Sequence, residues 1–424
     1  MILNTLRNNA LLKVLSLNSF SVGISFVLGI VSTKIVSVFL GPSGMALLGS
    51  FRNFTSMNKS VATLGINNSL IKLFVENKND KKELSILYST FFWVFLVLSI
   101  FVGGITLVFA NDFSDVLFFT SDFANPIRFF GLLLPLIVIN AFWLAIYNGL
   151  EQFYRIVLIQ IISNILIFGV TTFLIWSKNS TGGLYAIAVG ELVLFFVTFL
   201  FVVKDKSQFK FDLQKVIDNK YLNVIKKFSV MALLSAFIVP LALIFIRNYI
   251  VKTHSIQDAG IWDATNKISS FYMSVFSSGL SLYYMPKLAA LETDSDFRIE
   301  LKSYFKVFVP LFFLMLVIIL LFKDFLLNMV FTKDFIQVKQ VLIWQLAGDL
   351  LRVMTLAFGY QIVVKSRMKD YFVIELVFNG TYLILSFYLV KVFSFEGALQ
   401  SYFYASLVTF ILILFMFRKL FVKS

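Results

Sequence analysis

Long apolar runs recur along the whole chain of 424 residues. Each is about 20 residues or longer, the length that an α-helix needs to cross roughly 30 Å of hydrocarbon. With 59% hydrophobic residues, the chain carries more apolar surface than a soluble fold of this size can bury. The sequence therefore predicts an all-α polytopic membrane protein. Twelve spans are predicted, at 11–39, 44–74, 85–110, 127–150, 153–176, 183–203, 227–251, 259–289, 303–322, 339–364, 369–391 and 397–418.

The spans divide into two sets of six around a lysine-rich connection, residues 204–226, at the midpoint of the chain. We therefore predict an N-terminal six-helix lobe at 1–203 and a C-terminal six-helix lobe at 227–424. A weak internal match supports parallel repeats, because Gly44 and Gly260 open the second and the eighth span. Two such lobes would enclose a central cleft.

The distribution of basic residues predicts the orientation in the membrane. Of the 37 Lys and Arg residues, 23 lie in loops and ends on one side, 7 on the other side and 7 within the spans. Because the cytoplasmic side carries the excess of Lys and Arg, both termini are predicted to be cytoplasmic. The net charge of +14 is thus explained by loops and needs no nucleic-acid partner.

Polar residues interrupt the second span with helical spacing. Arg52 and Lys59 are the charged members of this stripe. A charge near the bilayer centre costs about 3 kcal/mol, so two cations favour a wet, protein-lined cavity with an anionic ligand. The polar neighbours that we expect to join them in binding substrate are Asn53, Ser56, Thr63 and Asn67.

The eighth span, the equivalent of the second in the other half, has its own polar stripe. Lys267, Ser270 and Ser274 are predicted to bind substrate, and Asp263 is a candidate for coupling or gating. Two matching polar faces are what a cleft between two bundles requires. The alternative is a packing face, because serine is common where membrane helices meet.

Other intramembrane charges are further candidates for coupling and gating. Asp349 and Arg352 are three residues apart and can pair on one helix face, either as a structural pair or as one that opens during transport. Glu191 and Glu375 could carry a proton or a cation, or could neutralise a nearby lysine.

Lys34 and Arg247 lie near the ends of their spans. Such long side chains can simply reach the membrane interface. Because both lie near the outer end of the predicted cleft, we also keep them as candidate substrate ligands.

The charge balance predicts the sign of the ligand. The spans hold seven basic groups against four acidic ones, which favours a phosphate-bearing or acidic substrate. The chain has no cysteine and a single histidine, His254, which argues against metal sites and thiol catalysis. No P-loop, GxSxG or HExxH motif is present, so we expect a transporter without a cofactor rather than an enzyme.

Three segments resemble the Wzx-type flippases of lipid-linked oligosaccharides, which translocate O-antigen or enterobacterial common antigen lipid III. The segments are LGPSGMALLGSFRNF (Leu40 to Phe54), GIWDATNKISSFYMSVFSSGLSLYYMPKLAALE (Gly260 to Glu292) and IWQLAGDLLRVMTLAFGYQIVVKSRMKDYFVIELV (Ile343 to Val377). This polysaccharide transporter family belongs to the multidrug/oligosaccharidyl-lipid/polysaccharide exporter superfamily. The resemblance implies two six-helix lobes around a V-shaped central cleft that works by alternating access.

The resemblance also implies partners and a location. The substrate would be an undecaprenyl-pyrophosphate-linked oligosaccharide, flipped across a bacterial inner membrane among its lipids. A glycan polymerase is a candidate partner, and the driving force is either a gradient of H⁺ or Na⁺ or the downstream consumption of the substrate. An ion-coupled exporter of small molecules from the same superfamily is the alternative. A membrane enzyme of glycan assembly is a third hypothesis, which the modest predicted outer loops and their lack of histidine disfavour.

Overall fold

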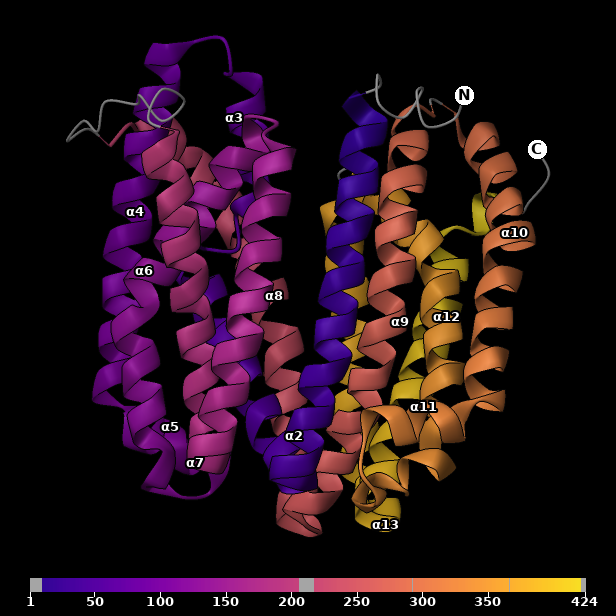
Figure 1. The fold of residues 1–424 in the computed structure, drawn as a ribbon. Coiled ribbons are helices and arrows are strands. Elements are labelled where there is room, and N and C mark those ends of the chain that lie inside the picture. The colour runs from indigo at the N-terminus through magenta and orange to yellow at the C-terminus, as the bar shows by residue number, and fades with distance from the viewer. Residues whose placement is uncertain (1–9, 206–216, 292, 366, 421–424) are drawn as a thin grey trace. The chain divides into compact units, whose positions relative to one another are not determined.

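The computed structural model describes residues 10–205, 217–291, 293–365 and 367–420. Within these ranges the chain forms helices and no strand, which confirms the predicted all-α class (Figure 1). Short 3₁₀ turns lie at Ser121–Phe123, Lys333–Phe335 and Arg418–Leu420. The α-helices are α2 (Ala10–Ala62), α3 (Asn67–Glu76), α4 (Lys81–Val108), α5 (Ala110–Phe118), α6 (Ala124–Gly149), α7 (Phe153–Lys204), α8 (Asn219–Thr253), α9 (Ile256–Ala289), α10 (Asp294–Leu321), α11 (Lys323–Val330), α12 (Val338–Val364) and α13 (Met368–Met416).

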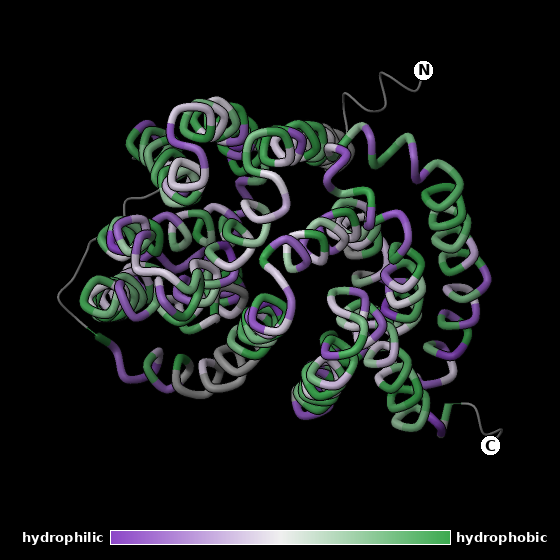
Figure 2. The backbone as a smooth tube through the Cα atoms, turned by 90° about the horizontal axis from the view of Figure 1, so that it is seen from below, coloured by the Kyte–Doolittle hydropathy of each residue, from purple (hydrophilic) through white to green (hydrophobic). Residues whose placement is uncertain are grey.

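Eight of the described helices are long and apolar enough to cross a membrane. Figure 2 shows hydrophobic residues along most of the helical length, with hydrophilic residues interspersed. The 34-residue helix α9 is not among the eight, and it is the helix that carries Asp263 and Lys267. The chain is therefore a polytopic membrane protein, and the number of segments that cross the membrane stays a prediction.

Three long helices, α2, α7 and α13, are each interrupted by one residue with non-helical backbone angles. Each interruption falls where the sequence predicts a loop between two spans. In α2 the break is Gly41 (φ 63°), followed by Pro42. Glycine adopts this left-handed backbone without strain, and proline is well suited to the first turn of the helix that follows. In α7 and α13 the breaks are Asn179 (φ 48°) and Ser394 (φ 53°).

The second predicted span, 44–74, is not one helix. Helix α2 ends at Ala62, and the turn that follows holds Leu64 (φ 52°) and Gly65 (φ 63°). Two consecutive left-handed residues end an α-helix, because its residues need negative φ. The prediction that Asn67 shares a helical face with Arg52 is therefore wrong, since Asn67 begins the separate helix α3.

The chain divides into two compact units. The first unit comprises residues 1–39 and 50–237, and the second comprises 40–49 and 238–424. Compared with the predicted lobes, ten residues of α2 group with the second unit, and the start of α8 groups with the first. Both differences fall inside helices. Apolar runs predict where helices begin and end, but they do not predict where a unit boundary crosses a helix.

Hydrogen bonds and ion pairs attach the residues on either side of the predicted linker to the first unit. Asp205 is buried, forms an ion pair with Arg155 and accepts a hydrogen bond from Tyr147 (3.0 Å). Lys220, near the start of α8, donates to Glu83 at the start of α4, and this hydrogen bond raises the pKa of Lys220. Residues 206–216 of the linker lie outside the described residues.

Aromatic side chains form much of the core of each unit. In the first unit the rings of Phe51 and Phe130 meet edge to face, with centroids 6.1 Å apart. In the second unit Tyr284 and Tyr304 are fully buried, with centroids 4.9 Å apart. These contacts fix which face of α2 and which face of α9 turn inward, and so which faces remain for a ligand.

Candidate functional site

Helix α2 packs one face into the first unit and leaves its polar face outside the core. Phe51, Phe54 and Ala62 are buried, whereas Arg52 and Ser56 are exposed. This is the separation that the three- and four-residue spacing predicts. Arg52 and Ser56 therefore lie on the exposed face of α2, and their role in binding substrate stays a prediction.

Lys59, one turn beyond Ser56, forms an ion pair with Glu191 on α7. Its Nζ lies 2.9 Å from Oε2 and 3.2 Å from Oε1 of the carboxylate. The two side chains remain 31% and 29% exposed. The structure thus joins a predicted substrate ligand to a predicted coupling residue, and it favours the alternative in which Glu191 neutralises a lysine. Because both groups reach solvent, a ligand can approach either one.

Arg247 on α8 and Asp263 on α9 form a second pair, inside the second unit. Arg247 Nε donates to Asp263 Oδ2 (2.6 Å) and Nη2 donates to Oδ1 (2.7 Å), with side chains only 3% and 11% exposed. The guanidinium also lies 5.3 Å from the ring of Trp262. The prediction that Arg247 binds substrate directly is not met in this conformation, because a bidentate partner and burial occupy the guanidinium.

Gly49 on α2 covers this pair at close range. A Cβ atom at Gly49 would lie 2.7 Å from Asp263 Oδ2 and 2.9 Å from Arg247 Nη2. Those distances are shorter than van der Waals contact, so a side chain here would displace the ion pair. The second unit therefore needs glycine at this position, a requirement that the sequence alone did not reveal.

Helix α9 repeats the division seen in α2. Its buried face includes Trp262 and Tyr272, whereas Ser270 and Ser274 are exposed. Both hydroxyls donate to carbonyls of their own helix, Ser270 to Lys267 (2.7 Å) and Ser274 to Phe271 (3.0 Å). Their lone pairs remain able to accept hydrogen bonds from sugar hydroxyls.

Lys267, on the polar face of α9, is half-buried, with Nζ 5.1 Å from the ring centre of Phe271. The aromatic ring stabilises a cation held in a partly dry environment. Lys267 therefore keeps its predicted place beside Ser270 and Ser274 on one face.

Asp349 on α12 is fully buried and accepts hydrogen bonds from four side chains. Ser269 donates to Oδ2 (2.6 Å), Tyr402 donates to Oδ1 (2.6 Å), and Gln345 and Tyr272 are the other two donors. Among the described residues, no cation forms an ion pair with this carboxylate. The sequence analysis named Asp349 but none of its four hydrogen-bond donors. Two of them, Ser269 and Tyr272, are three residues apart, and this spacing could have predicted that they share one helix face.

The predicted pair of Asp349 and Arg352 does not form among the described ion pairs. The guanidinium of Arg352 stacks instead on Phe378, with Cζ 4.2 Å from the ring centre. Neutral donors already fill the acceptor sites of Asp349, and the ring offers Arg352 a cation–π partner. The spacing of three residues permits a pair but does not select it over these partners.

The remaining predicted residues are scattered. Glu375 accepts a hydrogen bond from Asn379 on its own helix (3.2 Å). Thr63 is buried and bonds back to the carbonyl of Lys59 (3.0 Å), so it is not available as predicted. Lys34 and Asn53 are half-buried on α2. The side chain of Asn67 lies outside the described residues.

The arrangement provides charge and hydrogen bonds but no reactive constellation. The described part of the chain contains no cluster of three or more His, Cys, Asp or Glu residues able to hold a metal ion. The polar face of α2 carries the cations Arg52 and Lys59, and the polar face of α9 carries Lys267 with the hydroxyls of Ser270 and Ser274.

Comparison with known proteins identifies the family. The family described as "Polysaccharide biosynthesis protein" matches residues 11–340. The chain belongs to this family.

Relatives and solved structures agree with this assignment. Proteins named "Lipid III flippase" from Escherichia coli (strain K12) and Shigella flexneri are 23% identical over 377 residues, which is 88% of this chain and 90% of theirs. The lipid II flippase MurJ, in an inward closed conformation, shares the fold with a TM-score of 0.76 at 13% identity over 94% of this chain and 87% of MurJ. A multidrug resistance MATE family transporter of the MOP superfamily has a TM-score of 0.71 at 14% identity, covering 94% of this chain and 96% of its own.

The family assignment agrees with the observed helical fold. This member of the polysaccharide biosynthesis family has the fold of polytopic MOP-superfamily transporters, which confirms the predicted fold class. It also confirms the resemblance that the three sequence segments indicated.

Proposed function

We propose that this protein flips an undecaprenyl-pyrophosphate-linked oligosaccharide, of the O-antigen or enterobacterial common antigen kind, from the cytoplasmic to the outer leaflet of a bacterial inner membrane. The observation that carries the proposal is the match to two lipid III flippases over 88% of this chain and 90% of theirs. A substrate of this kind has three parts: a doubly charged pyrophosphate, a hydroxyl-rich glycan and an apolar tail. The polar faces of α2 and α9 suit the first two.

The pyrophosphate binds at the cationic face of α2 in this proposal. Arg52 is exposed there, and an arginine can hold two phosphate oxygens at once. Lys59 is already bound to a carboxylate, so a phosphate oxygen would replace Glu191 and exchange one anion for another. Such an exchange avoids leaving a bare cation in the membrane when no substrate is bound.

The glycan binds beside the hydroxyls of Ser270 and Ser274 and the ammonium of Lys267. These groups line one accessible face of α9. Binding in a V-shaped cleft between two lobes, exposed alternately to the two sides of the membrane, is part of this proposal. The apolar tail remains among the membrane lipids.

Asp349 is our proposed site for the coupling ion, with H⁺ as the ion. A fully buried carboxylate without an ion-pair partner in the described residues is costly in its charged form, so a proton can neutralise it. Its hydroxyl donors can turn to accept a bond from the protonated form. Transport by Asp349→Asn should lose its dependence on a pH gradient, and an unchanged dependence in that variant would exclude the site.

Orientation and partner complete the proposal. The excess of basic residues places both termini in the cytoplasm, which attachment of a reporter to either end tests. A glycan polymerase that consumes the flipped product would act on the other side of the membrane.

The experiment is glycan display in cells that lack the chromosomal copy. We expect Arg52→Gln with Lys59→Gln to abolish surface glycan at normal protein levels, because the substrate loses both cations of the α2 face. Lys306→Gln is the matched control, since it removes an exposed cation from α10, a helix that carries neither polar face. Wild-type display in the double variant would refute recognition of the pyrophosphate by α2.

The MATE fold similarity favours a second candidate, an ion-coupled exporter of small molecules. Overproduction would then raise resistance to cationic drugs, and deletion would leave surface glycan unchanged. Loss of glycan without any change in drug resistance supports the flippase.

A further inference from the structure

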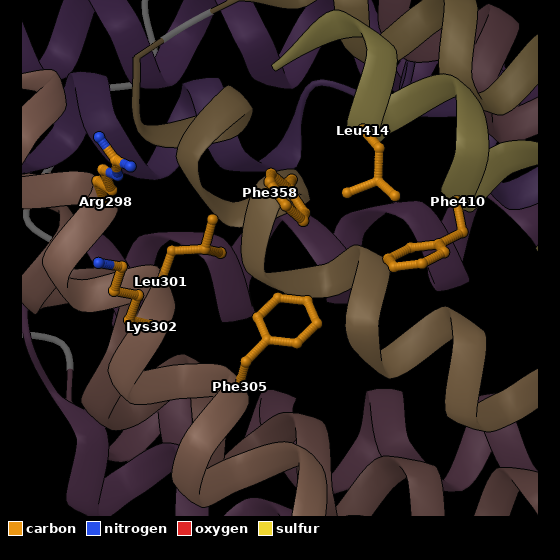
Figure 3. Close-up of a pocket in the computed structure, with 7 residues that line it drawn as sticks. All are labelled: Arg298, Leu301, Lys302, Phe305, Phe358, Phe410 and Leu414. Atoms are coloured by element: carbon orange, nitrogen blue, oxygen red, sulfur yellow. The ribbon is translucent and has the colours of Figure 1, made fainter. Parts of the chain in front are cut away.

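A groove on the second unit combines aromatic walls with a cationic edge. Its volume is about 290 Å³, and its lining comes from α10, α12 and α13. Figure 3 shows side chains of α10 on one side and of α13 on the other, with Phe358 of α12 between them. None of these residues belongs to the two polar faces described above.

The lining follows from the helical spacing of α10. Arg298, Lys302 and Phe305 recur at intervals of four and three residues, so they share one face of the helix. Phe305 of α10 and Phe410 of α13 line the groove together with the fully buried Phe358 (Figure 3). The groove is therefore apolar inside and basic at one end.

The two cations at the end of the groove form no ion pair within the part of the chain that the structure describes. Neither Arg298 nor Lys302 has an ion pair among the described residues, and no acidic residue lines the groove. Other cations at the adjoining helix ends are paired, Lys287 with Glu300 (2.6 Å) and Arg367 with Asp370 (2.6 Å). Like charges four residues apart on a helix repel each other, so an anion between them would be stabilising.

We propose that this groove binds an anionic phospholipid, with one acyl chain between α10 and α13 and the phosphate at Arg298 and Lys302. Pockets for small molecules start at about 300 Å³, so this volume suits a length of acyl chain rather than a bulky head group. Basic sites between membrane helices on the cytoplasmic side are suited to acidic lipid head groups. On the proposed orientation this end of α10 lies at the cytoplasmic leaflet.

A free phosphate ion does not fit the same features. Inorganic phosphate would use the two cations but would leave the aromatic walls of Phe305 and Phe410 without a partner. A neutral phospholipid would use the walls but not the unpaired charges. Only a lipid that carries a net negative head group uses both parts of the groove.

Native mass spectrometry of the purified full chain tests the proposal, with phosphatidylglycerol and phosphatidylcholine of identical acyl chains as probes. We expect the wild type to retain phosphatidylglycerol preferentially. Arg298→Gln with Lys302→Gln should reduce that preference at least about tenfold, since each basic residue contributes about 1 kcal/mol to binding acidic lipid. Lys306→Gln, one turn further along α10, is the matched control and should bind as the wild type does.

A second variant tests the apolar half of the groove. Leu414→Trp would fill the space between α13 and Phe358 while leaving both cations in place. We expect it to reduce retention of phosphatidylglycerol, and we expect excess inorganic phosphate not to displace the lipid from the wild type. Equal lipid retention by the wild type, the double variant and Leu414→Trp would overturn the proposal, as would complete displacement by phosphate.

Discussion

Two ion pairs, one in each unit, use similar groups in opposite surroundings. Lys59 and Glu191 meet through one ammonium, and nearly a third of each side chain is exposed. Arg247 and Asp263 meet through two parallel hydrogen bonds, with the side chains 3% and 11% exposed. The first pair can exchange its partner for a ligand, whereas the second is enclosed by Gly49 and Trp262.

The difference teaches that a charge inside a membrane segment does not by itself indicate a substrate ligand. Replacing Glu191 by a phosphate on Lys59 requires little desolvation, because solvent already reaches both groups. Opening the Arg247 pair would separate two charges that are largely removed from solvent, at a cost of several kcal/mol. We therefore propose that the exposed pair takes part in recognition and that the enclosed pair stabilises the second unit.

The largest expected effect is on stability, from breaking the buried pair. Arg247→Leu leaves Asp263, whose side chain is only 11% exposed, without its bidentate partner, which should lower the free energy of unfolding by about 3–5 kcal/mol. Unfolding of the purified protein by a denaturing detergent measures the change. Lys252→Gln, which removes an exposed cation from the end of the same helix, should change the free energy of unfolding by less than about 1 kcal/mol.

The double variant Arg247→Leu with Asp263→Leu sharpens this prediction. Removing both charges should recover most of the lost stability, because a buried pair and an apolar replacement have similar free energies. If the double variant were as unstable as Arg247→Leu, packing rather than charge would explain the loss.

An intermediate effect should follow from Gly49→Ala. The added Cβ would meet Asp263 Oδ2 at 2.7 Å, so the helix or the ion pair must move. Overpacking of this kind costs about 1–3 kcal/mol. Gly104→Ala on α4 is the matched control, because a Cβ there meets nothing within 4 Å. Equal melting temperatures for the two variants would contradict the close approach.

The exposed pair should show a small effect on stability and a large, asymmetric effect on transport. Lys59→Gln and Glu191→Gln should each change the free energy of unfolding by less than about 1 kcal/mol, as exposed pairs do. Lys59→Gln removes a phosphate ligand and should reduce glycan display, whereas Glu191→Gln keeps the cation and should reduce it less. Equal loss in both variants would mean that the pair itself, and not Lys59 alone, is required.

The smallest effect is expected on α9. Ser270→Ala and Ser274→Ala remove exposed hydroxyls that bond only to their own helix in the described structure, so stability should change by no more than about 0.5 kcal/mol. If these hydroxyls bind glycan, the double variant should slow transport in a reconstituted assay. Unchanged transport would favour the alternative in which the serines form a packing face.

The periodicity of the sequence predicted the features that a single helix determines, namely where helices form and which of their faces are polar. The apolar runs gave the helices, and the spacing of Arg52 and Ser56 gave the accessible face of α2. The end of α2 was missed because Leu64 and Gly65 adopt left-handed backbone inside an apolar run, which hydropathy does not register.

Partners between helices could not be predicted in the same way. Lys59 meets Glu191, which is 132 residues away, and Asp349 meets Tyr402 on another helix. Such contacts depend on how helices are rotated and packed. The neighbour three residues away, Arg352, was therefore an attractive but wrong partner for Asp349.

Reconstitution tests the central claim most directly. Purified wild-type protein and the variant Arg52→Gln with Lys59→Gln would be placed in liposomes that contain a fluorescent polyprenyl-pyrophosphate-linked oligosaccharide. Movement of the label between leaflets would be followed by chemical quenching from outside. We predict protein-dependent movement for the wild type and little above the protein-free rate for the variant. Equal movement in both, or no movement in the wild type, would contradict a flippase that holds its substrate through the cations of α2.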